Sequence, residues 1–206
     1  MSSSDAVTVP KNKLSARFVA ALEYAMEKHA DQTRKAKDIT YLGHLLGAAS
    51  HVLEAGGSEE VAIAALLHDV IEDCGGEAVF DEIVEKFGTR VADIAMACSD
   101  SFVADPDVKL PWRDRKEHHI AKLRTTFFED RDVLMVTAAD KLHNLTCIVA
   151  DLDVDGRESL SRFNEPDGIL WYYEEMLQLI ADSQVSAFLH AQLASKVAEF
   201  RVHVGA

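Results

Sequence analysis

Two adjacent residues with metal-binding side chains, His68 and Asp69, follow the fully apolar run VAIAALL and precede Glu72 and Asp73. If one helix continued through this stretch, residues four apart would share a face, and these polar groups would cluster within one turn. Burying several ionisable groups without partners costs several kcal/mol, so a metal ion or a substrate is the natural compensation. This stretch is therefore the first candidate for a functional site.

A metal ion needs more ligands than one helix supplies, and two other segments offer them. His44 stands near the start of a helix expected over residues 41–55, and Asp140 follows a second apolar, β-branched run, VLMVTAA. The expected ligand set is His44, His68, Asp69 and Asp140. Two imidazoles with two carboxylates suit manganese, iron or zinc better than calcium or copper(I).

Three segments match the motifs of a known family. HADQTRK at 29–35 resembles H-x-x-Q-x-R-K, HDVIED at 68–73 resembles HD-x-x-ED, and ADKLHNL at 139–145 resembles D-K-L-x-N. With the split H…HD…D pattern, they make the chain similar to the HD metal-dependent phosphohydrolases. The resemblance is to the hydrolase domain of the RelA/SpoT alarmone enzymes and to the stand-alone small alarmone hydrolases, over roughly residues 14–180. Many relatives have proline after the first ligand histidine, where this chain has Leu45.

The resemblance implies a reaction and a set of roles. The reaction is manganese-dependent hydrolysis of the 3′-pyrophosphate of guanosine tetra- and pentaphosphate to GDP or GTP and pyrophosphate, without synthetase activity. Glu72 and Asp73 would orient and deprotonate the attacking water, because adjacent carboxylates beside a dication can act as a base. Arg34, Lys35 and Asn144 would hold the nucleotide.

Other residues are weaker candidates for substrate contact. Lys109 and Arg113, at the end of the longest expected loop, could contact phosphate, although a solvated helix start explains them equally well. An aromatic residue at 171–173, Tyr172 by preference, would approach the nucleotide as in relatives, although core packing is the alternative. Arg162 is a weaker companion candidate for nucleotide contact. His143 could reach the metal ligands from outside, whereas Lys141 is expected to point away from them.

Three alternative functions stay open. Another HD phosphohydrolase, such as a nucleotidase or an adenosine-alarmone hydrolase, would share every motif, because these motifs do not encode the base. An HD-type di-iron oxygenase would need additional histidine ligands. A catalytically silent nucleotide-binding regulator predicts a lost ligand position, whereas all the expected positions are filled.

Composition limits the class of protein. The chain has 206 residues, of which 48% are hydrophobic, enough for a substantial globular core. No signal segment or apolar run of about 18 residues is apparent, and the three isolated cysteines indicate a reducing compartment, so a cytoplasmic protein without membrane contact is expected. A net charge of −14 argues against nucleic-acid binding but permits a small nucleotide beside local cations.

The apolar residues recur at helical spacing, and no long stretch has the alternation of a strand. The expected fold is an all-α HD-domain bundle with the metal site at its centre. We expect a tail at 1–13, the phosphohydrolase domain at 14–183, and a C-terminal helix at 184–206 packed on the same domain. The helix that carries Asp140 is expected over 131–149, before an acidic loop at 151–157.

Overall fold

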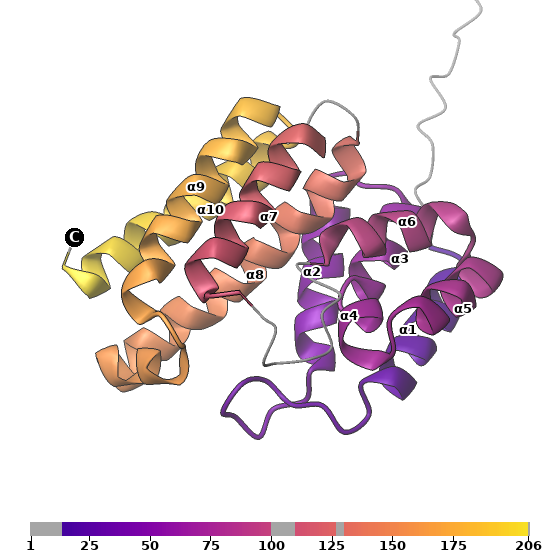
Figure 1. The fold of residues 1–206 in the computed structure, drawn as a ribbon, viewed down its shortest axis with the longest axis horizontal. Helices are drawn as coiled ribbons and strands as arrows, with labels where there is room; N and C mark the ends of the chain where they lie inside the picture. The colour runs from indigo at the N-terminus through magenta and orange to yellow at the C-terminus, as the bar shows by residue number, and fades with distance from the viewer. Residues whose placement is uncertain (1–13, 100–109, 127–129, 206) are drawn as a thin grey trace, which may run out of the picture.

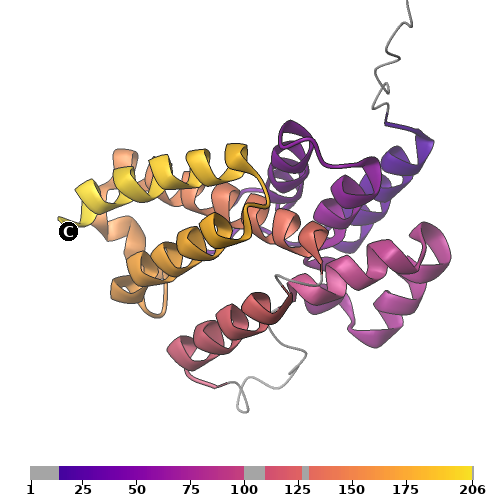
Figure 2. The same ribbon diagram turned by 90° about the horizontal axis from the view of Figure 1, so that it is seen from above.

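The computed structural model describes residues 14–99, 110–126 and 130–205, and the regular elements of this part of the chain are all helices (Figures 1 and 2). Its only β-type pairing there is an isolated bridge between Thr33 and Thr40. The predicted all-α fold is therefore confirmed. In chain order the elements are α1 (Ala16–Lys28), α2 (Leu42–Glu54), α3 (Glu59–Leu67), α4 (Val70–Cys74), α5 (Glu77–Phe87), α6 (Thr89–Cys98), α7 (Trp112–Thr126), α8 (Arg131–Asp155), the 3-10 helices η2 (Gly156–Arg162) and η3 (Pro166–Gly168), α9 (Ile169–Ser183) and α10 (Ala187–Val204).

Helix α8 is the central element of the fold. It contacts α2, α3, α6, α7, α9, α10 and η2. Helices α1 to α6 gather on one side of the molecule and α9 and α10 on the other, and α8 runs from one group to the other (Figures 1 and 2). A side chain on α8 can therefore meet residues from either group.

Helix α3 is the most completely buried element. Every residue from Val61 to Leu67 is buried, and the helix contacts α1, α2, α6 and α8. A helix that is apolar on all sides is stable only inside a core. Its start is set by Ser58, whose hydroxyl accepts a hydrogen bond from the backbone N–H of Val61. The polar residues that follow Leu67 consequently emerge from the middle of the core.

The helix expected to continue through residues 68–73 is interrupted. Helix α3 ends at Leu67, His68 and Asp69 form a turn, and α4 begins at Val70. The Nδ1 of His68 lies 2.8 Å from the carbonyl oxygen of Ala65, so the imidazole hydrogen-bonds a carbonyl near the end of α3. The expectation of one continuous helix was wrong. Neighbouring residues of a helix diverge by about 100°, and the turn lets His68 and Asp69 face the same point.

Helix α8 is longer than expected, and the predicted acidic loop at 151–157 is wrong. The helix runs to Asp155 and ends at Gly156, which has φ 64°. Leu152 is buried and extends the apolar stripe that includes Leu145 and Val149. The acidic residues face away from that stripe or form ion pairs, so they do not end the helix. The helix ends instead at Gly156, a residue that readily takes a left-handed conformation.

The segment 131–162, which contains α8, is the one described stretch long and apolar enough to cross a membrane. Of its most apolar window, 61% is buried inside the fold, as in the core helix of a globular protein. The last helix, α10, packs against α8 and α9. The division of the chain at residues 13 and 183 stays a prediction.

Asp130 should contribute to stability because it begins helix α8. Its carboxylate accepts hydrogen bonds from the backbone N–H groups of Asp132 and Val133 and pairs with Arg90. We expect Asp130→Ala to lower the free energy of unfolding by about 1–2 kcal/mol in urea denaturation. Asp130→Asn should lose less, since asparagine also caps helices.

The same position predicts a pH dependence of stability. Arg90 holds the pKa of Asp130 below its ordinary value. A depressed carboxyl pKa adds stability above the unfolded-state pKa of about 3.9, and this stability is lost as the pH falls through the folded-state pKa. The stability difference between wild type and Asp130→Asn should therefore shrink as pH falls from 6 to below about 4. A constant difference would contradict the assignment.

Candidate functional site

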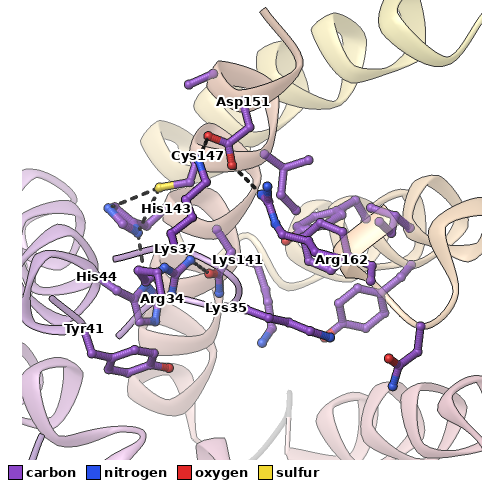
Figure 3. Close-up of a pocket in the computed structure, with 18 of the residues that line it drawn as sticks. Arg34, Lys35, Lys37, Tyr41, His44, Lys141, His143, Cys147, Asp151 and Arg162 are labelled. Atoms are coloured by element: carbon purple, nitrogen blue, oxygen red, sulfur yellow. Dashed lines mark hydrogen bonds and ion pairs between the residues drawn. The ribbon is translucent and has the colours of Figure 1, made fainter. Parts of the chain in front are cut away.

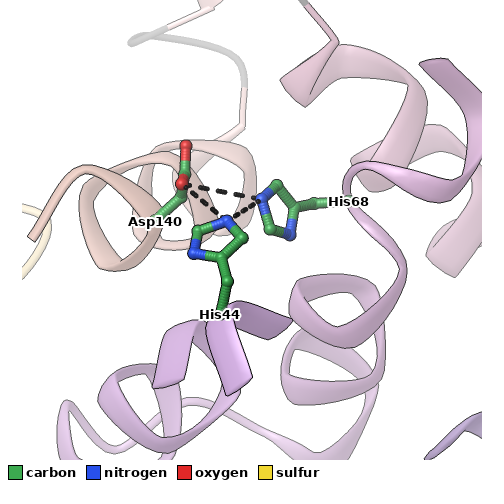
Figure 4. Close-up of side chains that lie close together, drawn as sticks. All are labelled: His44, His68 and Asp140. Atoms are coloured by element: carbon green, nitrogen blue, oxygen red, sulfur yellow. Dashed lines mark hydrogen bonds and ion pairs between the residues drawn. The ribbon is translucent and has the colours of Figure 1, made fainter. Parts of the chain in front are cut away.

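Three buried side chains from distant parts of the chain meet at one point (Figure 4). They are His44 from α2, His68 from the turn after α3, and Asp140 from α8, and each is at most 6% exposed. One donor atom from each lies within 4.8 Å of the others. Such a group of imidazoles and a carboxylate is a candidate site for a divalent metal ion.

Asp69 adds a fourth donor atom at the same point. Its Oδ2 lies 3.1 Å from His68 Nε2 and 3.4 Å from His44 Nε2. The two Nε2 atoms are 3.3 Å apart, and His44 Nε2 is 3.2 Å from Oδ1 of Asp140. Metal bonds of about 2.0–2.2 Å place neighbouring ligands roughly 3.0–3.5 Å apart in octahedral or tetrahedral geometry. The spacing of these donor atoms therefore fits one divalent metal ion.

The charges of these groups are strongly coupled. Burial by itself would lower the pKa of His68 and raise the pKa values of both carboxyl groups. Asp69 and Asp140 outweigh burial and raise the pKa of His68 well above its ordinary value. The neighbouring cationic groups, led by His68 for Asp69 and by Lys141 for Asp140, lower the two carboxyl pKa values well below theirs. The centre therefore favours positive charge between two ionised carboxylates.

Helix α8 and the segment before α2 orient the two carboxylates. The hydroxyl of Tyr41 donates a hydrogen bond to Asp69 Oδ2 over 2.6 Å, and Lys141 Nζ lies 2.6 Å from Asp140 Oδ2. The amide of Asn144, one turn further along α8, donates to Asp140 Oδ1. The expectation that Lys141 points away was wrong, because its long side chain bends back to the neighbouring residue. Sequence reasoning missed Tyr41, although its spacing of three residues before His44 was a usable signal.

His143 contacts the site from outside, as the sequence allowed. Its Nδ1 lies 3.0 Å from Nδ1 of His44, on the side of that ring opposite to Nε2, the atom that faces His68 and Asp140. Burial, followed by His44, lowers the pKa of His143 to about 4, so the ring is neutral near pH 7 and can accept a hydrogen bond. The ring fits closely against α2, since a Cβ at Gly47 would lie 1.9 Å from its Cδ2.

Glu72 and Asp73 lie on α4, immediately after the turn that carries two of the donor residues. Asp73 is exposed, and its Oδ2 accepts a hydrogen bond from the amide of Gln32 over 2.8 Å. The Oε1 of Gln32 is 2.6 Å from Nδ1 of the buried His29. The H-x-x-Q segment therefore contacts a carboxylate of the HD-x-x-ED segment.

A cavity of about 670 Å³ opens beside His44 (Figure 3). Arg34 lies within it and donates a hydrogen bond to Asn144 Oδ1 over 2.7 Å. Lys35 and Tyr172 also line the cavity. The structure thus brings four of the six predicted substrate-contact residues to one cavity. Its further basic lining residues are Lys37, Arg115, Lys116, Lys141 and Arg162, of which Arg162 was a weaker candidate from the sequence.

Of the other two predicted contacts, Arg113 is not among the described residues that line this cavity. Lys109 lies outside the described residues. Arg113 pairs with Glu117 over 2.8 Å and lies over the ring of Trp171, 3.2 Å from its centroid. Residues 113 and 117 share one face of α7, whereas Arg115 lines the cavity. The basic run was correctly noticed, but helical rotation turns Arg113 elsewhere.

Comparison with known protein families gives a match to the HD domain over residues 21–162. The chain is 34% identical over 125 residues to the guanosine-3′,5′-bis(diphosphate) 3′-pyrophosphohydrolase of Aquifex aeolicus, covering 61% of this chain and 17% of that protein. It is 30% identical to the bifunctional (p)ppGpp synthase/hydrolase SpoT of Escherichia coli, covering 75% and 21%. The chain therefore spans about a fifth or less of these two bacterial relatives.

Shorter relatives match over most of their length. The chain is 32% identical over 134 residues to the guanosine-3′,5′-bis(diphosphate) 3′-pyrophosphohydrolase MESH1 of Drosophila melanogaster, covering 64% of this chain and 69% of that protein. A solved structure of a metazoan orthologue of SpoT superposes with a TM-score of 0.70 at 26% identity, covering 90% of this chain and 96% of the other. A crystal structure from Listeria monocytogenes superposes with a TM-score of 0.64 at 30% identity, covering 76% and 97%. The chain therefore belongs to the HD-domain family, within which it is similar to the guanosine-3′,5′-bis(diphosphate) 3′-pyrophosphohydrolases.

Proposed function

We propose that the protein hydrolyses the 3′-pyrophosphate of guanosine tetra- and pentaphosphate. Water attacks the phosphorus attached to the ribose 3′ oxygen, the bond between them breaks, and GDP or GTP and pyrophosphate leave. The observation that carries the proposal is that His44, His68 and Asp140 form a candidate metal site, with Asp69 beside both histidines, next to a cavity lined by basic residues. The name of the Drosophila relative, which the chain covers over most of its length, supports the same reaction.

In this proposal His44, His68, Asp69 and Asp140 hold one divalent ion, with manganese as the expected ion and iron or zinc as substitutes. When bound, the ion supplies Lewis acidity and lowers the pKa of a water molecule. The mixture of two imidazoles and two carboxylates supports a borderline-hard ion. Tyr41 and Asn144 keep the two carboxylates aimed at it through their hydrogen bonds.

Glu72 and Asp73 act on the attacking water. One carboxylate orients it and the other accepts its proton, and mutual repulsion helps one of them to serve as a base. The hydrogen bond from Gln32 restrains the Asp73 carboxylate, which would otherwise rotate freely in solvent. The leaving ribose 3′ oxygen must gain one proton, which solvent can supply, so that the proton lost by the attacking water and the proton gained by the new 3′-hydroxyl balance.

Arg34, Lys35 and Asn144 bind the nucleotide. Arg34 is held by Asn144, whose amide group also contacts Asp140, so the guanidinium is anchored next to the metal-binding carboxylate. Its remaining N–H groups can donate to the phosphate that reacts. The aromatic side chain of Tyr172 lines the same cavity and can contact the nucleotide. We further propose that the protein works in the cytoplasm, where its three free cysteines would stay reduced.

The reaction itself is tested with metal-stripped protein, incubated with and without manganese. We expect manganese-dependent release of pyrophosphate with GDP from guanosine tetraphosphate, detected by ion-exchange chromatography. Ordinary nucleoside triphosphates serve as the control and should stay intact. If only the adenine analogue is hydrolysed, the metal site stands but guanine is the wrong nucleobase. If the protein binds nucleotide without hydrolysing it, the result supports a nucleotide-binding regulator.

Asp73→Asn tests the proposed base. The amide keeps the shape and can still contact Gln32, but it cannot accept a proton from water. Turnover should fall at least about a hundredfold, while metal content measured by mass spectrometry stays near that of wild type. Asp81→Asn, which changes an exposed carboxylate on α5, is the matched control. Unchanged turnover in Asp73→Asn would remove this residue from the mechanism.

Asp69→Ala tests the ligand assignment. Removing one of four donors should lower the affinity for manganese at least about tenfold, since even residues that only orient ligands have effects of this size. Isothermal titration of metal-stripped protein with manganese chloride measures the change. Asp93→Ala, at an exposed position on α6, should bind as wild type does. Full affinity in Asp69→Ala would show that Asp69 is not a ligand.

A further inference from the structure

The end of the cavity furthest from His44 along α8 contains two cations that share one carboxylate. Lys37 pairs with Oδ1 of Asp151, and Arg162 pairs with Oδ2 (Figure 3). The three residues come from the segment before α2, from α8 and from η2. We call Lys37, Asp151 and Arg162 the distal triad. Their side chains are 28%, 15% and 13% exposed, so all three are largely shielded from water.

The distal triad carries more positive charge than its own carboxylate neutralises. Two cations face one anion, which leaves a net charge of +1 in a half-enclosed cavity. Each oxygen of Asp151 engages one cation, and a lysine and an arginine together offer further N–H donors. A positive charge that lacks a counter-ion and is shielded from water is unfavourable unless an anion binds beside it. The carboxylate also fixes both cationic groups before any ligand arrives, which lowers the entropy cost of binding.

Helix geometry sets the spacing between this triad and the metal-binding end. Asp140 and Asp151 are eleven residues apart on α8, which is about three turns and about 16 Å along the helix. Eleven residues return to nearly the same face, so both carboxylates point to the same side of α8. Asn144 and Cys147, at intermediate positions on that face, line the cavity between them.

A ligand that fills the cavity therefore meets cations at both ends. Arg34 and Lys141 lie beside the metal-binding carboxylate, and Lys37 and Arg162 lie three turns away. The ribose and base of a nucleotide can span the part between them. Such a cavity selects a nucleotide that carries phosphate at two separate positions over one that carries phosphate at a single position.

We propose that Lys37 and Arg162, held by Asp151, bind the 5′-diphosphate or 5′-triphosphate arm of the substrate while its 3′-pyrophosphate lies at the metal-binding end. The proposal rests on the proposed function for the orientation of the substrate. It makes the distal triad a specificity site: the enzyme recognises the phosphate arm that it does not cut. Arg162 also lies over the ring of Phe163, 4.8 Å from its centroid, which keeps its guanidinium plane in place.

The alternative role is purely structural, because the distal triad also ties three segments of the fold together. The two roles differ in what a neutral variant changes. A structural tie affects thermal stability and all ligands alike. A phosphate site affects only ligands with a 5′-phosphate arm.

The test measures GDP binding to the whole, metal-loaded protein by isothermal titration, since GDP has no 3′-pyrophosphate to cut. Lys37→Met and Arg162→Met keep the apolar stems and remove one charge each. We expect each variant to weaken GDP binding about tenfold, as for the loss of a charge-assisted contact. Lys196→Met breaks an ion pair within α10, and Arg201→Met breaks one between α10 and α9. Both are matched controls and should bind GDP as wild type does. GDP binding that is unchanged in both triad variants, or wild type that binds GDP no better than guanosine, would overturn the proposal.

Kinetics give a second, independent measurement. With guanosine tetraphosphate, the triad variants should show a KM raised about tenfold and an unchanged kcat, because the contact is far from the reacting atoms. With guanosine 3′-diphosphate, which lacks the 5′ arm, wild type and variants should have equal KM. A KM raised equally for both substrates would show a structural role only. Arg162→Lys should keep part of the GDP affinity that Arg162→Met loses. If Arg162→Lys binds GDP as weakly as Arg162→Met, the positive charge at residue 162 is not what binds GDP.

The two proposals can fail separately. GDP binding requires no turnover, so a negative binding result refutes the distal triad and leaves the hydrolase reaction untouched. Absence of pyrophosphate release by wild type refutes the proposed function, even if GDP binding depends on Lys37 and Arg162.

Discussion

The structure depends on how it offsets the burial of polar groups at its centre. His44, His68 and Asp140 are almost inaccessible to water and come from α2, the turn after the apolar helix α3, and α8. Burying any one of these side chains without a partner would cost several kcal/mol. Together with Asp69 they form a group in which opposite charges face one another at 3.1–3.6 Å, and a divalent ion fits between them. At this point α2, the turn after α3 and α8 meet.

Helix α8 connects this centre to the cavity. One face of the helix packs the core, and another presents Asp140, Asn144 and Asp151 to the cavity. The first carboxylate serves the metal-binding group, and the last holds two cations about three turns away. A single rigid helix thus sets the distance between Asp140 at one end of the cavity and the two cations beside Asp151 at the other. A loop could not hold such a distance as constant.

Much of the site could be predicted because each candidate had a local signal. The apolar runs before His68 and Asp140 marked buried helices, and a buried helix that ends in ionisable residues needs compensation. The signal was weaker where side-chain direction mattered. The direction of Lys141 was predicted wrongly, since a long flexible chain can bend back to its neighbour. Arg113 was placed among phosphate contacts, but helical rotation directs it to Trp171.

The sequence by itself determined the all-helical class, the candidate donor residues and the basic character of the segment at 34–37, because periodicity and residue type are local properties of the chain. Only the tertiary structure decided how these parts meet. It broke the helix after Leu67 so that His68 and Asp69 face one point, continued α8 to Asp155, and brought Lys37 and Arg162 to one carboxylate. These outcomes depend on contacts between residues that are distant in the chain, and local pattern carries no record of such contacts.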